Sequence, residues 1–145
     1  MARIEPLGIH EVDDEIRHLC EEAERQSGTS ASTRTYARNP VVVKALAAFR
    51  ATLVREGTID PALRELVRLK IAAIDDETSD LLSPRERAGI RFAEKLALDH
   101  HKVDDAFWSE MRSHFSEAEI IELVAHTTLY IGFGRFNEIV GVDPA

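Results

Sequence analysis

The sequence is poor in cysteine, in basic residues and in long apolar runs. Its only cysteine is Cys20, which excludes a disulfide within one chain and a zinc site built on several cysteines. The 18 lysines and arginines are outnumbered by 26 acidic residues, so the formal net charge is −8. Nucleic acids and anionic membranes bind basic surfaces, and neither is therefore an expected partner. No apolar run approaches the ~20 residues that span a bilayer.

Several motifs of targeting and cofactor binding are also missing. The first residues, Met-Ala-Arg-Ile-Glu-Pro, lack the apolar stretch of a secretory signal peptide, so a cytoplasmic protein is expected. Neither a glycine-rich phosphate loop nor a Gly-x-Ser-x-Gly elbow occurs, and no cofactor is expected. The acidic segment Asp75–Asp80 lacks the spacing and the glycine of an EF-hand, which favours a solvated loop over a calcium site.

What the sequence does contain is apolar residues at helical spacing along most of its 145 residues. This pattern predicts an all-α fold, a single-domain bundle of about six helices that spans residues 1–145. Spacing, cap residues and prolines place the helix starts near residues 8, 39, 60, 83, 104 and 116. The segment Ser27–Arg38 lacks apolar periodicity and is expected to be a linker on the surface.

The segment Asp60–Ile74 is the predicted core helix. Leu63 and Val67 belong to its apolar face, whereas Glu65 falls at the edge of that face. Spacing alone favours Glu65 as a surface carboxylate that pairs with Arg68 or with a neighbour of Leu69.

The last predicted helix is apolar nearly all round between Ile120 and Phe133. Such a helix is expected at the centre of the fold or in a subunit interface. Gly132 and Gly134 weaken the helix, so they suggest that another backbone approaches closely there.

Glu122 and His126 stand four residues apart on this last helix. A carboxylate-bridged metal site needs Glu-x-x-His on two helices, and only one helix offers anything similar here, so no metal is expected. The favoured role is a buried hydrogen bond between Glu122 and His126, or a contact of His126 with Glu65 or Arg135.

Three blocks in register resemble the carboxymuconolactone decarboxylase family, which includes the alkylhydroperoxidase D-like proteins. They are Asn39–Gly57, Asp60–Ala72 (Asp-Pro-Ala-Leu-Arg-Glu-Leu-Val-Arg-Leu-Lys-Ile-Ala) and Phe115–Pro144. The resemblance implies a homo-oligomer that acts on a small-molecule hydroperoxide or lactone, as an antioxidant peroxidase or a decarboxylase-like enzyme. It also implies that Glu65 is a proton relay acting with a histidine, for which His126 is the candidate.

The chain departs from the family where the peroxidases carry Cys-x-x-Cys followed by histidine. The core helix here continues as Ile-Asp-Asp-Glu-Thr-Ser-Asp, and Cys20 lies far away beside the acidic Glu21 and Glu22, which disfavour a thiolate. Either the redox helix is lost, or the 145-residue sequence omits residues of the native protein. In the second case, two consecutive alpha carbons between Ile71 and Glu77 would be separated by more than the ~3.8 Å of a trans peptide.

Two functions follow from this departure. The first is a peroxidase-related enzyme whose redox cysteines are missing from this sequence. The alternative is a non-catalytic oligomeric helical scaffold that has lost the redox helix. A cysteine pair in the full-length gene would favour the first, and a continuous gene that matches this sequence would favour the second.

Overall fold

The computed structural model describes residues 2–72 and 81–142. Over these residues the chain forms seven α-helices and no strand, which confirms the all-α prediction. The spacing of alpha carbons across residues 71–77 lies outside the described residues. In the part of the chain described, no helix is both long and apolar enough to cross a membrane.

The chain divides into two compact units, Met1–Glu56 together with Arg135–Ala145, and Gly57–Gly134. The helix α7 (Glu117–Val140) contributes its first part to the second unit and its end to the first. The expectation of one domain over residues 1–145 stays a prediction.

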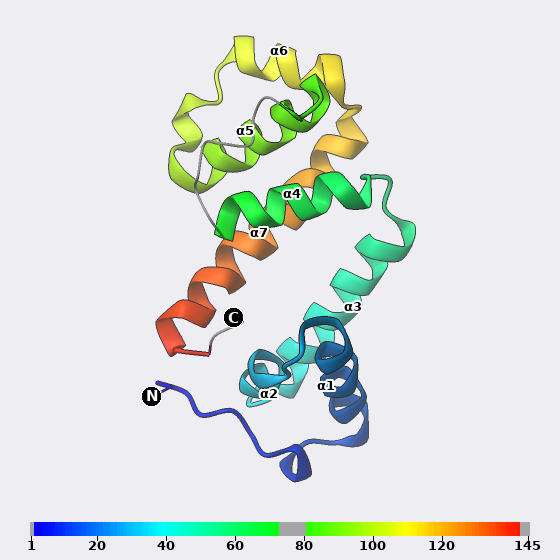
Figure 1. Cartoon of the computed structure of the whole chain (residues 1–145), viewed down its shortest axis with the longest axis vertical. Coiled ribbons are helices and arrows are strands. Elements are labelled where there is room, and N and C mark those ends of the chain that lie inside the picture. Colours follow the sequence, from blue (N-terminus) through cyan, green and yellow to red (C-terminus); the bar gives the residue numbers. More distant parts are fainter. Residues whose placement is uncertain (1, 73–80, 143–145) are drawn as a thin grey trace. The chain divides into compact units, whose positions relative to one another are not determined.

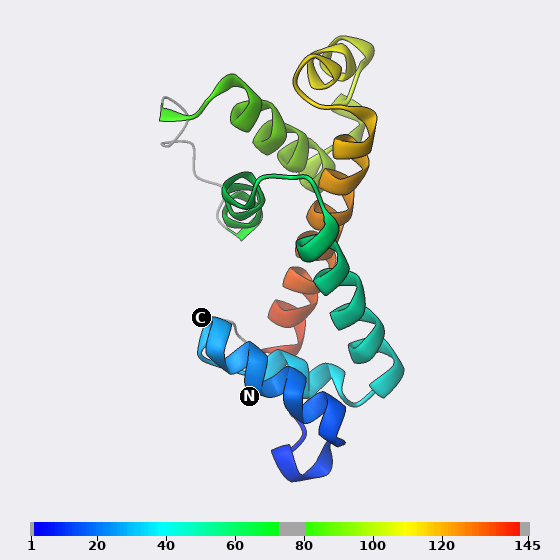
Figure 2. The ribbon, with the colours of Figure 1, turned by 90° about the vertical axis from the view of Figure 1, so that its right-hand side faces the viewer.

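The first unit contains α1 (Asp14–Ser27), α2 (Ala31–Tyr36) and α3 (Pro40–Glu56), which lie beside one another in Figure 2. Asp13 caps α1 by accepting a hydrogen bond from the Ile16 amide, 2.8 Å long. One cluster of buried apolar residues lies in this unit and consists of Val12, Ile16, Cys20, Ala37 and Val43.

The prediction of a linker between Ser27 and Arg38 is wrong, because α2 forms within it. Its buried residues are the small side chain of Thr35 and the adjoining Ala37, which leave no apolar stripe in the sequence. The Arg34 guanidinium holds α2 by donating to the Leu7 carbonyl over 2.8 Å. Because this hydrogen bond joins residues far apart in the sequence, apolar periodicity could not predict the helix.

The second unit contains α4 (Pro61–Ala72), α5 (Pro84–Leu98), α6 (Asp105–His114) and the first part of α7 (Figure 1). Their apolar faces meet in one core. Its buried members are Ile59, Leu63, Val67, Ala88, Phe92, Ala93, Phe107, Met111, Phe115, Ile120 and Leu123. The prediction that α7 is central is confirmed for its inner face, because Leu123 is fully buried.

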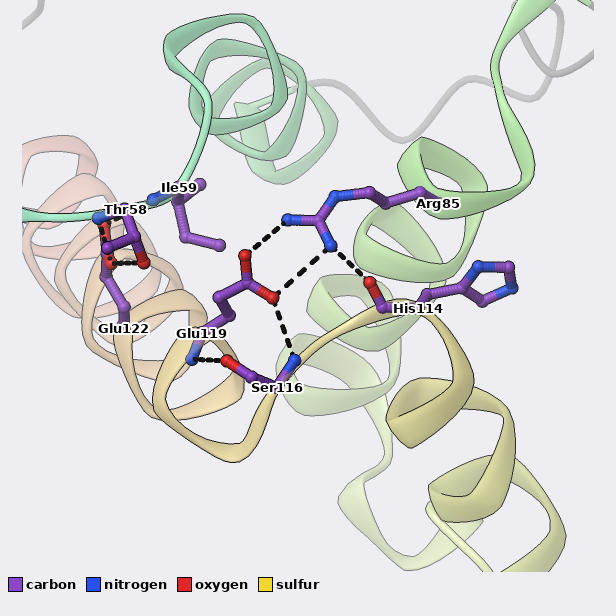
Figure 3. A network of polar contacts seen from close by, with 7 residues as sticks. All are labelled: Thr58, Ile59, Arg85, His114, Ser116, Glu119 and Glu122. Atoms are coloured by element: carbon purple, nitrogen blue, oxygen red, sulfur yellow. Dashed lines mark hydrogen bonds and ion pairs between the residues drawn. The ribbon is translucent and has the colours of Figure 1, made fainter.

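A polar network ties the start of α5 to the start of α7, as Figure 3 shows. The Arg85 guanidinium donates to Glu119 over 3.0 Å and also to the His114 carbonyl. Glu119 in turn accepts from the Ser116 amide at 2.8 Å, while the Ser116 hydroxyl accepts from the Glu119 amide. Ser116 and Glu119 therefore form a capping box at the predicted helix start, and the ion pair between Arg85 and Glu119 extends it.

The surroundings of Gly132 and Gly134 on α7 differ from those that the sequence predicts. Among the described residues, no atom lies within 4 Å of a Cβ built on Gly132 or Gly134. The predicted close approach of another backbone to these glycines is thus wrong within this chain. Ile121 on the same helix is 70% exposed.

Candidate functional site

Glu122 on α7 accepts hydrogen bonds from Thr58 and Ile59, which precede α4 in the chain (Figure 3). One carboxylate oxygen accepts from the Thr58 amide at 2.7 Å and from the Thr58 hydroxyl at 3.1 Å. The other accepts from the Ile59 amide at 3.1 Å. Burial raises the pKa of Glu122, but these donors outweigh it and lower the pKa below its usual value. The carboxylate is consequently ionised at neutral pH.

His126 lies one turn further along α7 and is only 4% exposed. Its Nε2 atom is 3.5 Å from Oε1 of Glu122, and no atom within hydrogen-bond geometry satisfies it in the described structure. Burial lowers the pKa of His126, and the charge of Arg64 lowers it further, against an opposing effect of Glu122. A neutral imidazole therefore stands beside an ionised carboxylate.

Tyr130 continues this line another turn along α7, and its ring lies 6.3 Å from the His126 ring at an interplanar angle of 19°. On α4, the positive charge of Arg64 contributes to lowering the pKa of His126, and the charge of Tyr130 contributes to raising the pKa of Arg68. We refer to Arg64, Arg68, Glu122, His126 and Tyr130 as the α4–α7 polar row. It combines two arginines, one carboxylate, one neutral imidazole and one tyrosine.

Glu65 does not join His126 in this row. Its side chain is 54% exposed and forms two hydrogen bonds with Arg68, of 2.6 and 2.8 Å. The bond from Arg68 lowers the pKa of Glu65 below its usual value. The sequence interpretation of a surface carboxylate paired with Arg68 is confirmed, while the proton-relay role of Glu65 stays a prediction.

The only thiol of the chain is inaccessible. Cys20 is fully buried on α1. Burial raises the pKa of its thiol, and the charges of Glu24 and Glu21 also raise it, against an opposing effect of Arg34. A protonated, covered thiol is a poor nucleophile.

Within residues 2–72 and 81–142 no three histidine, cysteine or acidic side chains converge as a metal site would require. Glu122 and His126 lie 3.5 Å apart, as their spacing predicts, but without the hydrogen bond that was expected between them. The sequence interpretation did not find Arg64 as a member of the row. Its spacing of four residues from Arg68, on the predicted core helix, was the available signal.

Comparisons with known proteins give a fold but no family. No protein-family model and no curated protein matches this chain. Solved structures do match it. An uncharacterized peroxidase-related protein from Ralstonia eutropha JMP134, described as an alkylhydroperoxidase AhpD core, superposes with a TM-score of 0.80 at 21% identity, over 99% of this chain and 92% of its own.

The second is an uncharacterized peroxidase-related protein from Silicibacter sp. TM1040, with a TM-score of 0.80 and 17% identity. It covers 98% of this chain and 92% of its own. The chain therefore has the helical fold of the AhpD core.

Acid is expected to destabilise the fold through His126. Its pKa in the folded protein is lowered below the ordinary ~6.5, so below that pH the unfolded chain binds more protons than the folded one. The contribution of His126 to the free energy of unfolding should be fully present above pH ~6.5 and should decrease as the pH drops toward the pKa of the folded protein. Urea denaturation between pH 8 and pH 5 measures this fall.

The control for this pH dependence is His126→Gln, which removes the titrating group but keeps a polar side chain. The slope of stability against pH just below pH ~6.5 should be shallower in this variant than in the unchanged protein. Equal slopes would show that other groups are responsible. The ordinary pKa of a glutamate is below that of a histidine, and the pKa of Glu122 is lowered further. The contribution of Glu122 to stability is therefore lost only at more acidic pH.

Proposed function

We propose that the protein is an alkylhydroperoxidase D-like, peroxidase-related protein that supplies the proton-transfer part of thiol-dependent hydroperoxide reduction. The observation that carries this proposal is the buried neutral His126 beside the ionised Glu122, in a chain with the AhpD-core fold. The thiols would come from a molecule or residues outside this sequence.

In hydroperoxide reduction, the α4–α7 polar row would carry out one step, a proton transfer. A thiolate attacks one peroxide oxygen, the O–O bond breaks, and the departing alkoxide needs a proton. A neutral His126 would take the proton from the attacking thiol and return it to the alkoxide as alcohol. Glu122 would stabilise the transient imidazolium, since its Oε1 is 3.5 Å from Nε2.

A non-catalytic helical scaffold is the second candidate. The observations that favour it are the complete burial of Cys20 and the engagement of Glu65 with Arg68. A dithiol cycle needs two sulfurs whose alpha carbons approach within ~7 Å, and this sequence has one cysteine. Both candidate functions are compatible with a homo-oligomer, and we propose that the protein forms one.

Peroxide consumption with dithiothreitol should not depend on Cys20. The thiol is buried and its pKa is raised, so it neither meets peroxide nor ionises readily. We expect equal rates for the unchanged protein and for Cys20→Ser, measured with cumene hydroperoxide. A rate that disappears in Cys20→Ser would make Cys20 the nucleophile and overturn this assignment.

The same assay separates the two candidate functions. If His126 transfers the proton, the unchanged protein should exceed the uncatalysed rate, and His126→Gln should lose about tenfold or more of that rate. His18→Gln is the matched control, since the His18 side chain is 70% exposed and on another helix. No acceleration by any form would favour the scaffold.

A further inference from the structure

We infer that Thr58 is a positioning residue of the proposed site, which acts on His126 through the Glu122 carboxylate. The inference rests on the proposed function, because it names the residue that helps to keep His126 neutral and able to accept a proton. The protonation of His126 can be measured without any peroxide, so the two can be tested separately. Thr58, Glu122 and His126 all lie in the second unit of the chain.

Thr58 holds one oxygen of Glu122 with two donors. Oε2 accepts from the Thr58 amide at 2.7 Å and from the Thr58 hydroxyl at 3.1 Å. An ionised carboxylate can only accept hydrogen bonds, so the hydroxyl proton points at Oε2. Each carboxylate oxygen has about two lone-pair sites, and Thr58 supplies a donor for both sites of Oε2. Oε1 is therefore the oxygen left for other partners.

Oε1 is also the oxygen that lies beside His126. It accepts from the Ile59 amide at 3.1 Å and lies 3.5 Å from Nε2 of His126, without a hydrogen bond to this nitrogen. The side chains of Glu122 and His126 are only 10% and 5% exposed, whereas Thr58 is exposed. Charges act on each other more strongly when they are covered from water. One carboxylate thus couples the hydroxyl of an exposed residue to a buried imidazole.

The Thr58 hydroxyl is expected to favour the neutral form of His126. Burial and the charge of Arg64 on α4 lower the pKa of His126, and Glu122 raises it. The Tyr130 ring lies 6.3 Å from the His126 ring. A donor to the carboxylate shares its negative charge and weakens its attraction for an imidazolium. Without the hydroxyl, Glu122 should therefore raise the pKa of His126 further.

The test is Thr58→Val, which removes the hydroxyl but keeps the amide and the shape of the side chain. The His126 ring is titrated by NMR, and His126→Gln identifies its signal among those of the six histidines. We expect a higher pKa of His126 in Thr58→Val than in the unchanged protein, and a return to the original pKa in Thr58→Ser, which restores a hydroxyl. Thr52→Val makes the same change at an exposed position of α3 and should leave the titration unmoved.

A purely structural role of Thr58 predicts a different result. Thr58→Val would then be less stable in urea, but the pKa of its His126 would equal that of the unchanged protein. That result, a lower pKa of His126, or a raised pKa that Thr58→Ser does not restore would overturn the inference.

The hydroperoxide assay is measured separately. Where turnover needs a neutral His126, the acidic limb of its pH profile should move to higher pH in Thr58→Val. A raised pKa of His126 without turnover by any form would support the role of Thr58 and contradict only the proposed function. Turnover with an unmoved pKa of His126 in Thr58→Val would contradict only the role of Thr58.

Discussion

Replacing Glu122 by alanine is expected to lower the free energy of unfolding by about 2–4 kcal/mol. The change removes a carboxylate that accepts from the Thr58 amide and hydroxyl and from the Ile59 amide. Hydrogen bonds to a charged group are each worth about 1.5–3 kcal/mol, and Ile59 is buried, so its amide would lose a partner that water cannot easily replace. Urea denaturation at pH 7 measures the loss.

The matched control is Glu117→Ala on the same helix. Glu117 has a side chain that is 78% exposed and forms an ion pair with Arg112, so its removal should cost less than about 1 kcal/mol. Glu122→Gln is expected to fall between the two, because it keeps an oxygen acceptor but loses the charge. If Glu122→Ala and Glu117→Ala were equally stable, the anchoring role of Glu122 would be wrong.

The starts of the helices were the most predictable part of the fold, because a cap is a local arrangement. Asp60 accepts from the Ala62 amide at 2.7 Å, and Asp104 accepts from the Phe107 amide at 2.8 Å. The capping box at Ser83 also forms, with Pro84 at the first helical position. Each of these needs only three or four consecutive residues to be recognised.

The candidate site was less predictable, because its partners are backbone groups far away in the sequence. Spacing correctly placed Glu122 and His126 next to each other, but the hydrogen bond expected between them is not formed. The amides of Thr58 and Ile59, by contrast, lie more than 60 residues away and carry no side-chain signal. Glu65 shows the opposite case, in which a local partner, Arg68, outweighs the more distant histidine that the family resemblance suggests.

The second large effect is expected on α7 itself. Leu123→Ala should lower the free energy of unfolding by about 2–5 kcal/mol, since it opens a cavity where a fully buried side chain contacts the core of the second unit. Ile121 lies two residues away, is 70% exposed and offers a matched control. Ile121→Ala should change stability by less than about 0.5 kcal/mol at low protein concentration.

The same pair of variants tests the proposed homo-oligomer. If a second copy covers the outer face of α7, Ile121→Ala should become destabilising as the protein concentration rises, because association stabilises the folded state by mass action. The Leu123→Ala loss should change little with concentration, since that side chain is buried within one chain. Thermal denaturation at several concentrations, with sedimentation of each variant, measures both. Concentration-independent behaviour of Ile121→Ala, with monomers throughout, would contradict an interface on this face.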